Sequence, residues 1–337
     1  MGPTLATGRG EKCADRYRAA AASLSASPDR PILLLAHVIV ADPTPATGSD
    51  SGSWRGEASL RFALSPSVPS LTIHQGGATS PLKIQRAYSR ADGRCELPLL
   101  HTAGGLVGGD QLEIATQLEA GSRALVTSVA AQKVYGSIGR SRRAPEGQWA
   151  RQVLEFRLED GADLEWLPQE LVLYAGALYE QESRVELAAD ASWLGAEVVR
   201  LGRSADGESL GAGRWRSSLA IRRAGRWSVV DRLELGGDSL DHGHGLDGAP
   251  VFGSLVWAAP APVSEELLLR CRDDRQGLVG EMACGRLDQG LVARYRGPST
   301  QAARYWFTRL WARIRAERGL APPQLPRVWP FQESPFG

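Results

Sequence analysis

Apolar and polar residues alternate with a period of two along several short stretches of the chain. Residues 58–64 and 111–118 show this alternation clearly, and Pro66 separates the first stretch from a further alternating run at 71–75. Period-two alternation is the pattern of a β-strand with one buried face. Because such runs recur with turn residues between them, the chain from residue 54 to about 297 is predicted to be predominantly β.

Two pairs of runs predict antiparallel hairpins. Residues 152–158 and 164–167 flank a short polar connection, and residues 216–222 and 226–235 flank another. Short connections that contain Gly between apolar runs are typical of neighbouring antiparallel strands. We therefore expect each pair to be joined by hydrogen bonds.

The pattern changes near the C-terminus. Ser299 is a favourable helix cap, apolar residues then follow at the i, i+3, i+4 and i+7 spacing of one helix face, and Gly319 ends the pattern. The four apolar residues are Phe307, Leu310, Trp311 and Ile314. This spacing favours core packing over partner binding for the aromatic residues. The expected fold class is mainly β, an elongated multi-stranded β domain with a few helices, including one near the C-terminus.

The N-terminal residues differ in composition from the rest. Residues 1–53 are rich in Ala, Ser, Pro, Thr and Gly, which predicts a mobile extension before a β domain at 54–330 and a short tail at 331–337. The apolar run at 31–41 is shorter than the roughly 20 residues that span a bilayer. It also lies too far from the N-terminus for a signal peptide. We expect no membrane association and a cytoplasmic location.

Composition narrows the function classes. The chain has 337 residues, 43% of them hydrophobic, so it can bury a large core. Its formal net charge of +1 provides no overall field for nucleic acid or an anionic membrane. Four scattered cysteines indicate neither a zinc site nor a disulfide framework. They are Cys13, Cys95, Cys271 and Cys284.

The run at 104–112 is the most patterned in the chain. Two glycine pairs, Gly104-Gly105 and Gly108-Gly109, bracket two apolar residues and lead to Asp110. The run lacks the Lys of a phosphate-binding Walker loop, and a strand follows it instead of the helix that a dinucleotide fingerprint requires. We interpret the glycines as structural, permitting positive φ or close backbone approach and positioning Asp110.

Three other runs place polar residues among apolar ones. Residues 127–135 contain Lys133 and Tyr135, residues 164–170 contain Glu165 and Glu170, and residues 201–208 contain Arg203 and Glu208. A carboxylate among apolar neighbours is costly unless it is paired, hydrogen-bonded or facing a wet cavity. Two interpretations of Glu165 remain open: a functional acid, or a strand residue that faces solvent while Leu164 and Trp166 face the core.

No complete catalytic apparatus is evident. His242 and His244 suggest a metal site, but no third ligand accompanies them, and His37, His74 and His101 stand alone as expected surface or satisfied core residues. The nucleophile elbow and the His-Glu-x-x-His motif are both absent. One alternative is a glycoside-processing enzyme that uses paired carboxylates such as Glu165 and Glu170, although Pro168 interrupts the strand between them.

Five motifs together resemble one known family, the urease accessory protein UreD, called UreH in some organisms. The residues that carry the resemblance lie at 104–112 (GGLVGGDQL), 127–135 (TSVAAQKVY), 164–170 (LEWLPQE), 201–208 (LGR followed by GE) and 326–329 (PRVW). They occur in the family's order across about 54–330, which makes the match more specific than any one motif.

The resemblance implies a largely β, elongated domain with a few helices and no enzymatic activity. It implies partners, namely UreF, the GTPase UreG and the urease subunits, with which the family helps to deliver nickel to the carbamylated-lysine site of apo-urease. It implies no tightly bound cofactor, only transient Ni²⁺, and a role as scaffold and ion conduit.

A conduit must hold Ni²⁺ weakly, which isolated carboxylates do better than thiolate clusters. We therefore expect five acids to line an internal polar passage: Asp110, Glu165, Glu170, Asp190 and Glu197. Possible partner or passage contacts are Lys133, Tyr135, Arg203 and Glu208. A scaffold without any passage is the remaining alternative.

Overall fold

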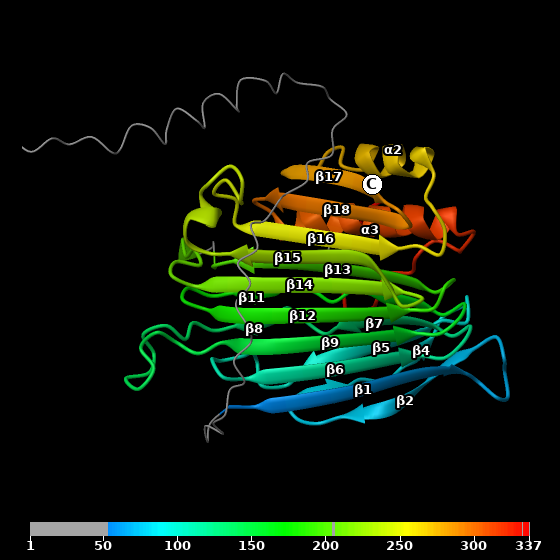
Figure 1. Cartoon of the computed structure of the whole chain (residues 1–337), viewed down its shortest axis with the longest axis horizontal. Coiled ribbons are helices and arrows are strands. Elements are labelled where there is room, and N and C mark those ends of the chain that lie inside the picture. The colour runs from blue at the N-terminus through cyan, green and yellow to red at the C-terminus, as the bar shows by residue number, and fades with distance from the viewer. Residues whose placement is uncertain (1–52, 204–205, 332, 337) are drawn as a thin grey trace, which may run out of the picture. The chain divides into compact units, whose positions relative to one another are not determined.

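A computed structural model describes residues 53–203, 206–331 and 333–336 (Figure 1). The expected N-terminal extension, apart from Ser53, lies outside these residues, as does the apolar run at 31–41. The described chain is mainly β, as predicted, with a helix near the C-terminus. None of its helices has the length and apolar content needed to cross a bilayer.

The strands form two sheets. The seven-stranded sheet has the order β15 (Arg226–Leu235), β14 (Arg214–Arg223), β12 (Leu178–Leu187), β9 (Ala150–Leu158), β6 (Gln111–Leu118), β1 (Arg55–Leu64), β2 (Thr72–Ala78). The eleven-stranded sheet has the order β17 (Glu281–Leu287), β18 (Gly290–Gly297), β16 (Val251–Ala258), β13 (Ser192–Leu201), β10 (Asp163–Trp166), β7 (Arg123–Ser128), β5 (Cys95–His101), β3 (Leu82–Ile84). Beside this path lie β4 (Tyr88–Ser89), β8 (Gln132–Val134) and β11 (Leu171–Leu173).

Apart from the short strands β8 and β11, successive strands of the central region alternate between the two sheets, and we call one strand of each sheet together a coil. The chain passes from β6 to β7, back to β9, and onward through β10, β12, β13 and β14, so that each strand pairs in parallel with the strand one coil earlier. Parallel pairing needs a crossover connection, and here the strand of the opposite sheet provides it. Antiparallel pairs flank these coils, namely β1–β2, β14–β15 and the series β13–β16–β18–β17.

The hairpin predicted at 152–158 and 164–167 is wrong, because β9 and β10 belong to different sheets. The connection between them stacks on the equivalent turn of the preceding coil, where the Gly121 amide donates to the Asp160 carbonyl over 2.8 Å. The next turn stacks in the same way, since the Gly161 amide donates to Asp190 Oδ1 over 2.8 Å. The hairpin predicted at 216–222 and 226–235 is confirmed as β14–β15.

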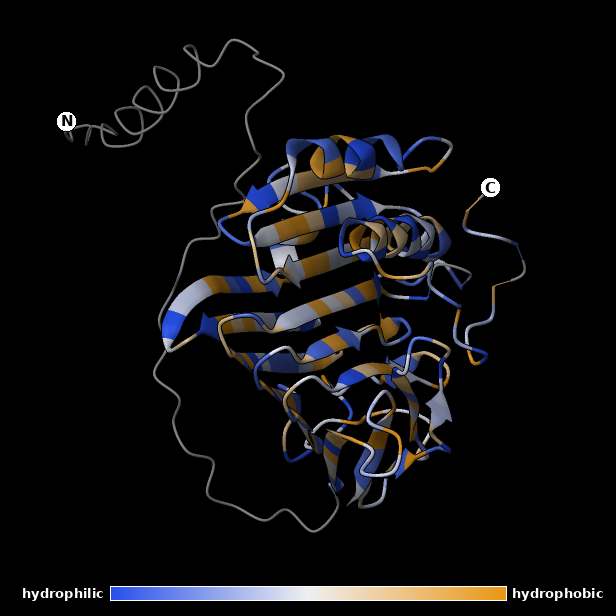
Figure 2. Cartoon of the chain, turned by 90° about the vertical axis from the view of Figure 1, so that its right-hand side faces the viewer, coloured by the Kyte–Doolittle hydropathy of each residue, from blue (hydrophilic) through white to orange (hydrophobic). Residues whose placement is uncertain are grey.

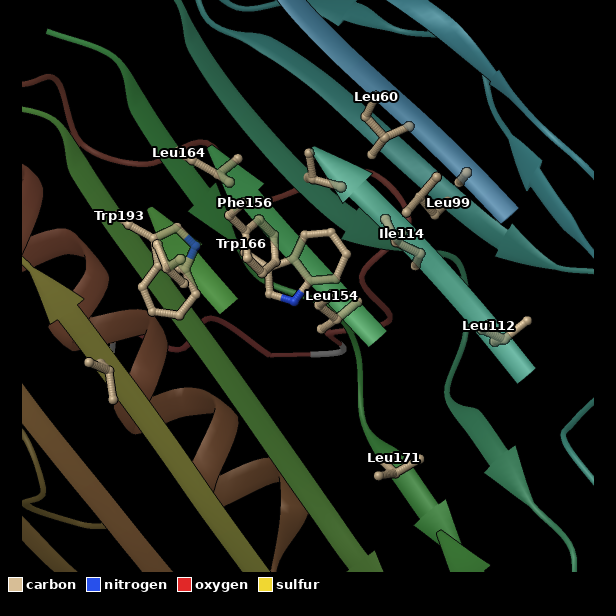
Figure 3. Packing of buried hydrophobic residues seen from close by; sticks show 14 of the residues in the cluster. Leu60, Leu99, Leu112, Ile114, Leu154, Phe156, Leu164, Trp166, Leu171 and Trp193 are labelled. Carbon is tan, nitrogen blue, oxygen red and sulfur yellow. The ribbon is translucent and has the colours of Figure 1, made fainter. Parts of the chain in front are cut away.

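The main core fills the space between the sheets (Figure 3). Phe156 of the seven-stranded sheet lies with its ring centroid 5.1 Å from that of Trp166 and 5.7 Å from that of Trp193, both in the other sheet. Strands of both sheets carry alternating hydrophobic and hydrophilic bands, as Figure 2 shows. The period-two pattern of the sequence is therefore the pattern that separates this core from the outer faces.

A second core lies between the eleven-stranded sheet and two helices, α2 (Glu265–Asp273) and α3 (Thr300–Glu317). The predicted cap is confirmed, because Ser299 Oγ accepts the Ala302 amide over 3.1 Å. Trp306, Phe307 and Trp311 are all buried, as core packing requires. The Trp306 indole also donates to the Cys271 carbonyl over 3.0 Å, which ties α3 to α2.

Trp306 is fully buried, so we expect Trp306→Ala to lower the free energy of unfolding by about 3–5 kcal/mol. Urea denaturation followed by circular dichroism measures the change. Glu317→Ala, at an exposed position of the same helix, is the control and should change it by less than about 0.5 kcal/mol. Equal effects of the two substitutions would contradict the assigned packing of α3.

Candidate functional site

Polar side chains line up across the inner face of the seven-stranded sheet. Gln181 of β12 lies in register with Gln152 of β9 on one side and with Ser217 of β14 on the other. All three line the space between the sheets, next to apolar positions such as Leu154 and Leu219. Because the coils are stacked in register, one polar position per strand produces a continuous polar row.

The opposite sheet presents a matching row. Glu197 of β13 lies in register with Ser254 of β16, and Ser254 lies in register with Arg294 of β18. We call the two rows together the polar layer. Its members are Gln152, Gln181, Ser217, Glu197, Ser254 and Arg294.

The polar layer connects the two sheets through Glu197. Gln181 Nε2 donates to Glu197 Oε2 over 3.0 Å, and Ser217 Oγ donates to Glu197 Oε1 over 3.4 Å. Arg294 donates to Ser254 Oγ and forms an ion pair with Asp231 of β15. The Glu197 carboxylate therefore accepts from two neutral donors, and the Arg294 guanidinium lies nearby.

A cavity of about 120 Å³ runs between the sheets beside the polar layer. Every member of the layer except Arg294 lines it. Further polar groups continue along its wall, namely His101, Ser128, Gln132 and Gln169. The wall of the cavity therefore contains the Glu197 carboxylate, the His101 imidazole and several amide and hydroxyl groups.

Burial raises the pKa of Glu197 to about 7, while the nearby Arg294 opposes the rise and Asp231 adds to it. At neutral pH this carboxyl group therefore exchanges between its charged and neutral forms. His101 also departs from ordinary behaviour, since burial lowers its pKa and Asp110 opposes that change. Its Nε2 atom is buried and has no hydrogen-bond partner among the described residues.

Glu165 lies on the face of the eleven-stranded sheet that α3 covers, opposite the face that lines the cavity. Its side chain is 2% exposed, and its carboxylate lies 3.4 Å from Arg94 Nε and 3.5 Å from Arg315 Nη1. Burial raises the pKa of Glu165, and the two guanidinium groups oppose the rise. Glu165 therefore neither faces solvent nor lines the cavity between the sheets.

Two more of the predicted acids also have firm partners. Glu170 Oε1 accepts from Arg304 Nη1 over 2.8 Å, and Asp190 sits on an exposed turn where it accepts the Gly161 amide. Glu165 and Glu170 are bound by different arginines, and neither lines the cavity between the sheets. This arrangement does not present them as a carboxylate pair facing one groove, which a glycoside hydrolase needs.

The described ranges contain no group of three or more His, Cys, Asp and Glu side chains placed to hold a metal ion. His242 and His244 are exposed on a turn.

Comparison with known proteins agrees with the motifs. The family model described as UreD urease accessory protein matches residues 55–330. This chain belongs to the UreD family. A urease accessory protein UreD of Synechococcus sp. (strain WH7805) is 60% identical over 296 residues, covering 84% of this chain and 93% of that protein. One of Prochlorococcus marinus (strain MIT 9303) is 60% identical over 292 residues, covering 83% and 98%.

The UreD glycine motif forms a turn that Asp110 fastens. Asp110 Oδ1 accepts the Trp54 amide and Oδ2 accepts the Val107 amide, both over 2.8 Å. Gly109 adopts a φ of 96°, and a Cβ on Gly108 would lie 2.7 Å from the Gln148 carbonyl oxygen. Gly104 also has positive φ, and Gly105 packs against Tyr135 and Lys133.

Three of the remaining motif residues, Tyr135, Arg203 and Glu208, lie around Tyr174. Tyr174 was not singled out from the sequence. The Tyr135 ring centroid lies 5.1 Å from that of Tyr174, and the Arg203 guanidinium lies 4.9 Å from the same ring. Arg203 Nε donates to Glu208 Oε2 over 2.7 Å, and Glu208 Oε1 accepts the Ala175 amide. Lys133 is exposed nearby on β8.

Most of the polar layer was not predicted from the sequence. Its signal is a polar residue at an inward strand position, such as Gln181 between the buried Tyr179 and Ser183. That signal is visible only once the strand register is known, because an isolated glutamine in a strand is ordinarily assigned to the solvent face.

Asp110 satisfies two backbone amides, so Asp110→Ala should lower the free energy of unfolding by about 1–3 kcal/mol. Chemical denaturation measures the change. Glu113→Ala, on the strand that follows Asp110 and with a more exposed carboxylate, should have little effect. If both variants unfold like the wild type, the turn does not depend on Asp110.

Glu197 should make stability depend on pH. Its folded pKa of about 7 lies above its ordinary value of 4.5, so wild-type stability falls as pH rises between these values and stays lower above pH 7. We expect Glu197→Gln to be more stable than the wild type at pH 8 by about 1–3 kcal/mol, and nearly equal at pH 5. Thermal unfolding at both pH values measures this difference, and parallel curves would contradict it.

Proposed function

We propose that this chain is a non-enzymatic urease maturation factor. In this proposal it works in the cytoplasm as a scaffold with UreF and the GTPase UreG on apo-urease, and nickel passes through the cavity between its sheets toward the urease active site. Family membership supports the link to urease, since the relatives are named urease accessory proteins.

The position of the Glu197 carboxylate in the cavity between the sheets is the single observation that carries the nickel part of the proposal. A carboxylate between two sheets is costly to remove from water, and among the described residues Glu197 accepts two hydrogen bonds, both from neutral groups. Ni²⁺ binds oxygen and nitrogen ligands. One carboxylate with amide and hydroxyl oxygens around it would hold the ion weakly enough to release it.

His101 provides a second ligand along the same cavity. Because burial lowers its pKa, the imidazole is neutral, which is the form that binds metal ions. Its unpartnered Nε2 atom is available to a passing ion. Glu197 and His101 are thus the two strongest single ligands that we assign to the passage.

The other four acids do not line the cavity and enter the proposal only as residues that stabilise the structure around it. Asp110 fastens the glycine turn, Asp190 caps a stacked turn, and Glu165 neutralises arginines under α3. Glu170 lies with Arg304 beside the cavity-lining Gln169. The ion passage itself therefore rests on Glu197.

In a reconstituted system of urease subunits and the remaining accessory proteins, Glu197→Gln should lower urease activity and urease-bound nickel. The expected loss is roughly tenfold or more, because a ligand of the ion is removed. Assembly of the complex, followed by size-exclusion chromatography, should be unchanged. This combination separates a passage from a scaffold that carries no ion.

Glu186→Gln is the matched control, because it makes the same chemical change on the outer face of β12. It should leave activity and nickel content at wild-type values. Full activation by Glu197→Gln would exclude the passage and leave the scaffold, and full activation without any copy of this chain would exclude both.

A further inference from the structure

The eleven-stranded sheet is interrupted next to Glu197. Strand β10 pairs with β13 up to Gly195, and β11 resumes the pairing only at Val199. Pro168 lies in the connection and has no amide hydrogen with which to continue the ladder. Residues 196–198 of β13 therefore have no strand on that side, and we call this gap the window.

The window separates two cavities. Pro168, Ala196, Glu197 and Val198 line both the cavity between the sheets and a smaller one, of about 30 Å³, on the opposite face of the sheet. The smaller cavity lies under α3 and is lined there by Arg304, Phe307, Thr308 and Trp311. Glu197 is thus the only charged residue among those that line both described cavities.

Arg304 occupies the far side of the window. Its side chain is 8% exposed, and Nη1 donates to Glu170 Oε1 over 2.8 Å and to Gln169 Oε1 over 3.2 Å. Nη2 is buried without a hydrogen-bond partner among the described residues. Arg304 lines the smaller cavity and its partner Glu170 does not, so a cation that leaves Glu197 in this direction meets the positive member of the ion pair first and is repelled by it.

The C-terminal segment holds Arg304 in place. The guanidinium lies 4.9 Å from the ring centroid of Trp329 and 4.6 Å from that of Phe331. Trp329 Nε1 donates to Thr127 Oγ1 over 2.8 Å, and Gln169 Nε2 donates to the Val328 carbonyl over 2.8 Å. We call residues 326–331 the strap.

We propose that the window is a side exit from the passage and that Arg304, held by the strap, keeps it shut to divalent cations. This inference rests on the proposed nickel passage. When the strap is displaced and Arg304 swings away, the positive charge leaves and the oxygens of Glu170 and Gln169 become free ligands beyond the window. One movement therefore both removes the barrier and presents the next binding groups.

The test is the rate of nickel release. The full chain, carrying His242→Ala and His244→Ala to remove exposed imidazoles, is loaded with Ni²⁺ alone and mixed with a chromogenic chelator in a stopped-flow instrument. Arg304→Gln should release nickel roughly tenfold faster than this parent chain. Adding Glu170→Gln to Arg304→Gln should slow the release again, because the receiving ligand is lost.

Two controls isolate the charge. Arg304→Lys keeps the positive charge and should release nickel at the parent rate. Arg313→Gln makes the same substitution as the test variant on the same helix, where the side chain pairs with Asp274, and should also leave the rate unchanged. Release by Arg304→Gln at the parent rate, or acceleration by either control, would overturn the inference.

Trp329→Ala provides a second route if Arg304→Gln fails to fold, because it loosens the strap and should also accelerate release. If a folded Trp329→Ala variant released nickel at the same rate as the parent chain, Arg304 and the strap would not control the window. Failure of the proposed passage is distinguishable, since Glu197→Gln would load as much nickel as the parent chain. Loss of loading in Glu197→Gln with no effect at Arg304 would leave the passage and remove only the gate.

Discussion

The in-register stacking of parallel strands is the constraint on which the rest of the structure depends. Each central coil places one strand in each sheet, and its neighbours repeat the same inward and outward positions. A residue at one inward position therefore lies beside the equivalent position of each adjacent coil, so polar residues at equivalent positions of β9, β12 and β14 come together, while Gln152 meets Leu112 on β6. This is how Gln152, Gln181 and Ser217 form a row inside a core that is otherwise built from Leu, Phe and Trp.

Buried acids in this chain differ in how completely they are paired. Asp163 is fully enclosed and lies between Arg94 and Arg318, and these guanidinium groups outweigh the effect of burial and lower its pKa to about 2. Glu197 has amide and hydroxyl donors with only a nearby guanidinium, and its pKa rises. The first arrangement fixes a charge in place. The second leaves a carboxyl group that can take up or release a proton near neutral pH.

Much of the fold follows from local patterns, while the pairing of strands does not. Alternation predicted the strands at 58–64 and 111–118, and helical spacing with a Ser cap predicted α3. The same local signal could not distinguish a hairpin at 152–167 from a crossing between sheets, because the turn is fastened by residues one coil away, such as Asp190. Glu165 shows the same limit, since α3 covers its strand face from far along the sequence. Glu197 was identified as a candidate acid, but its partners were not, because Gln181 and Ser217 join it only through the register.

The stacked turns at 119–122, 159–162 and 188–191 give the architecture a modular length. Each coil is fastened mainly to its nearest neighbours, and antiparallel pairs close the series. Gain or loss of one complete coil would change the extent of the interior by one strand spacing, about 4.8 Å, without disturbing the side chains of the remaining coils. The length of the cavity is therefore set by the number of coils. Evolution can change that length by whole coils while the residues that line the remaining coils stay the same.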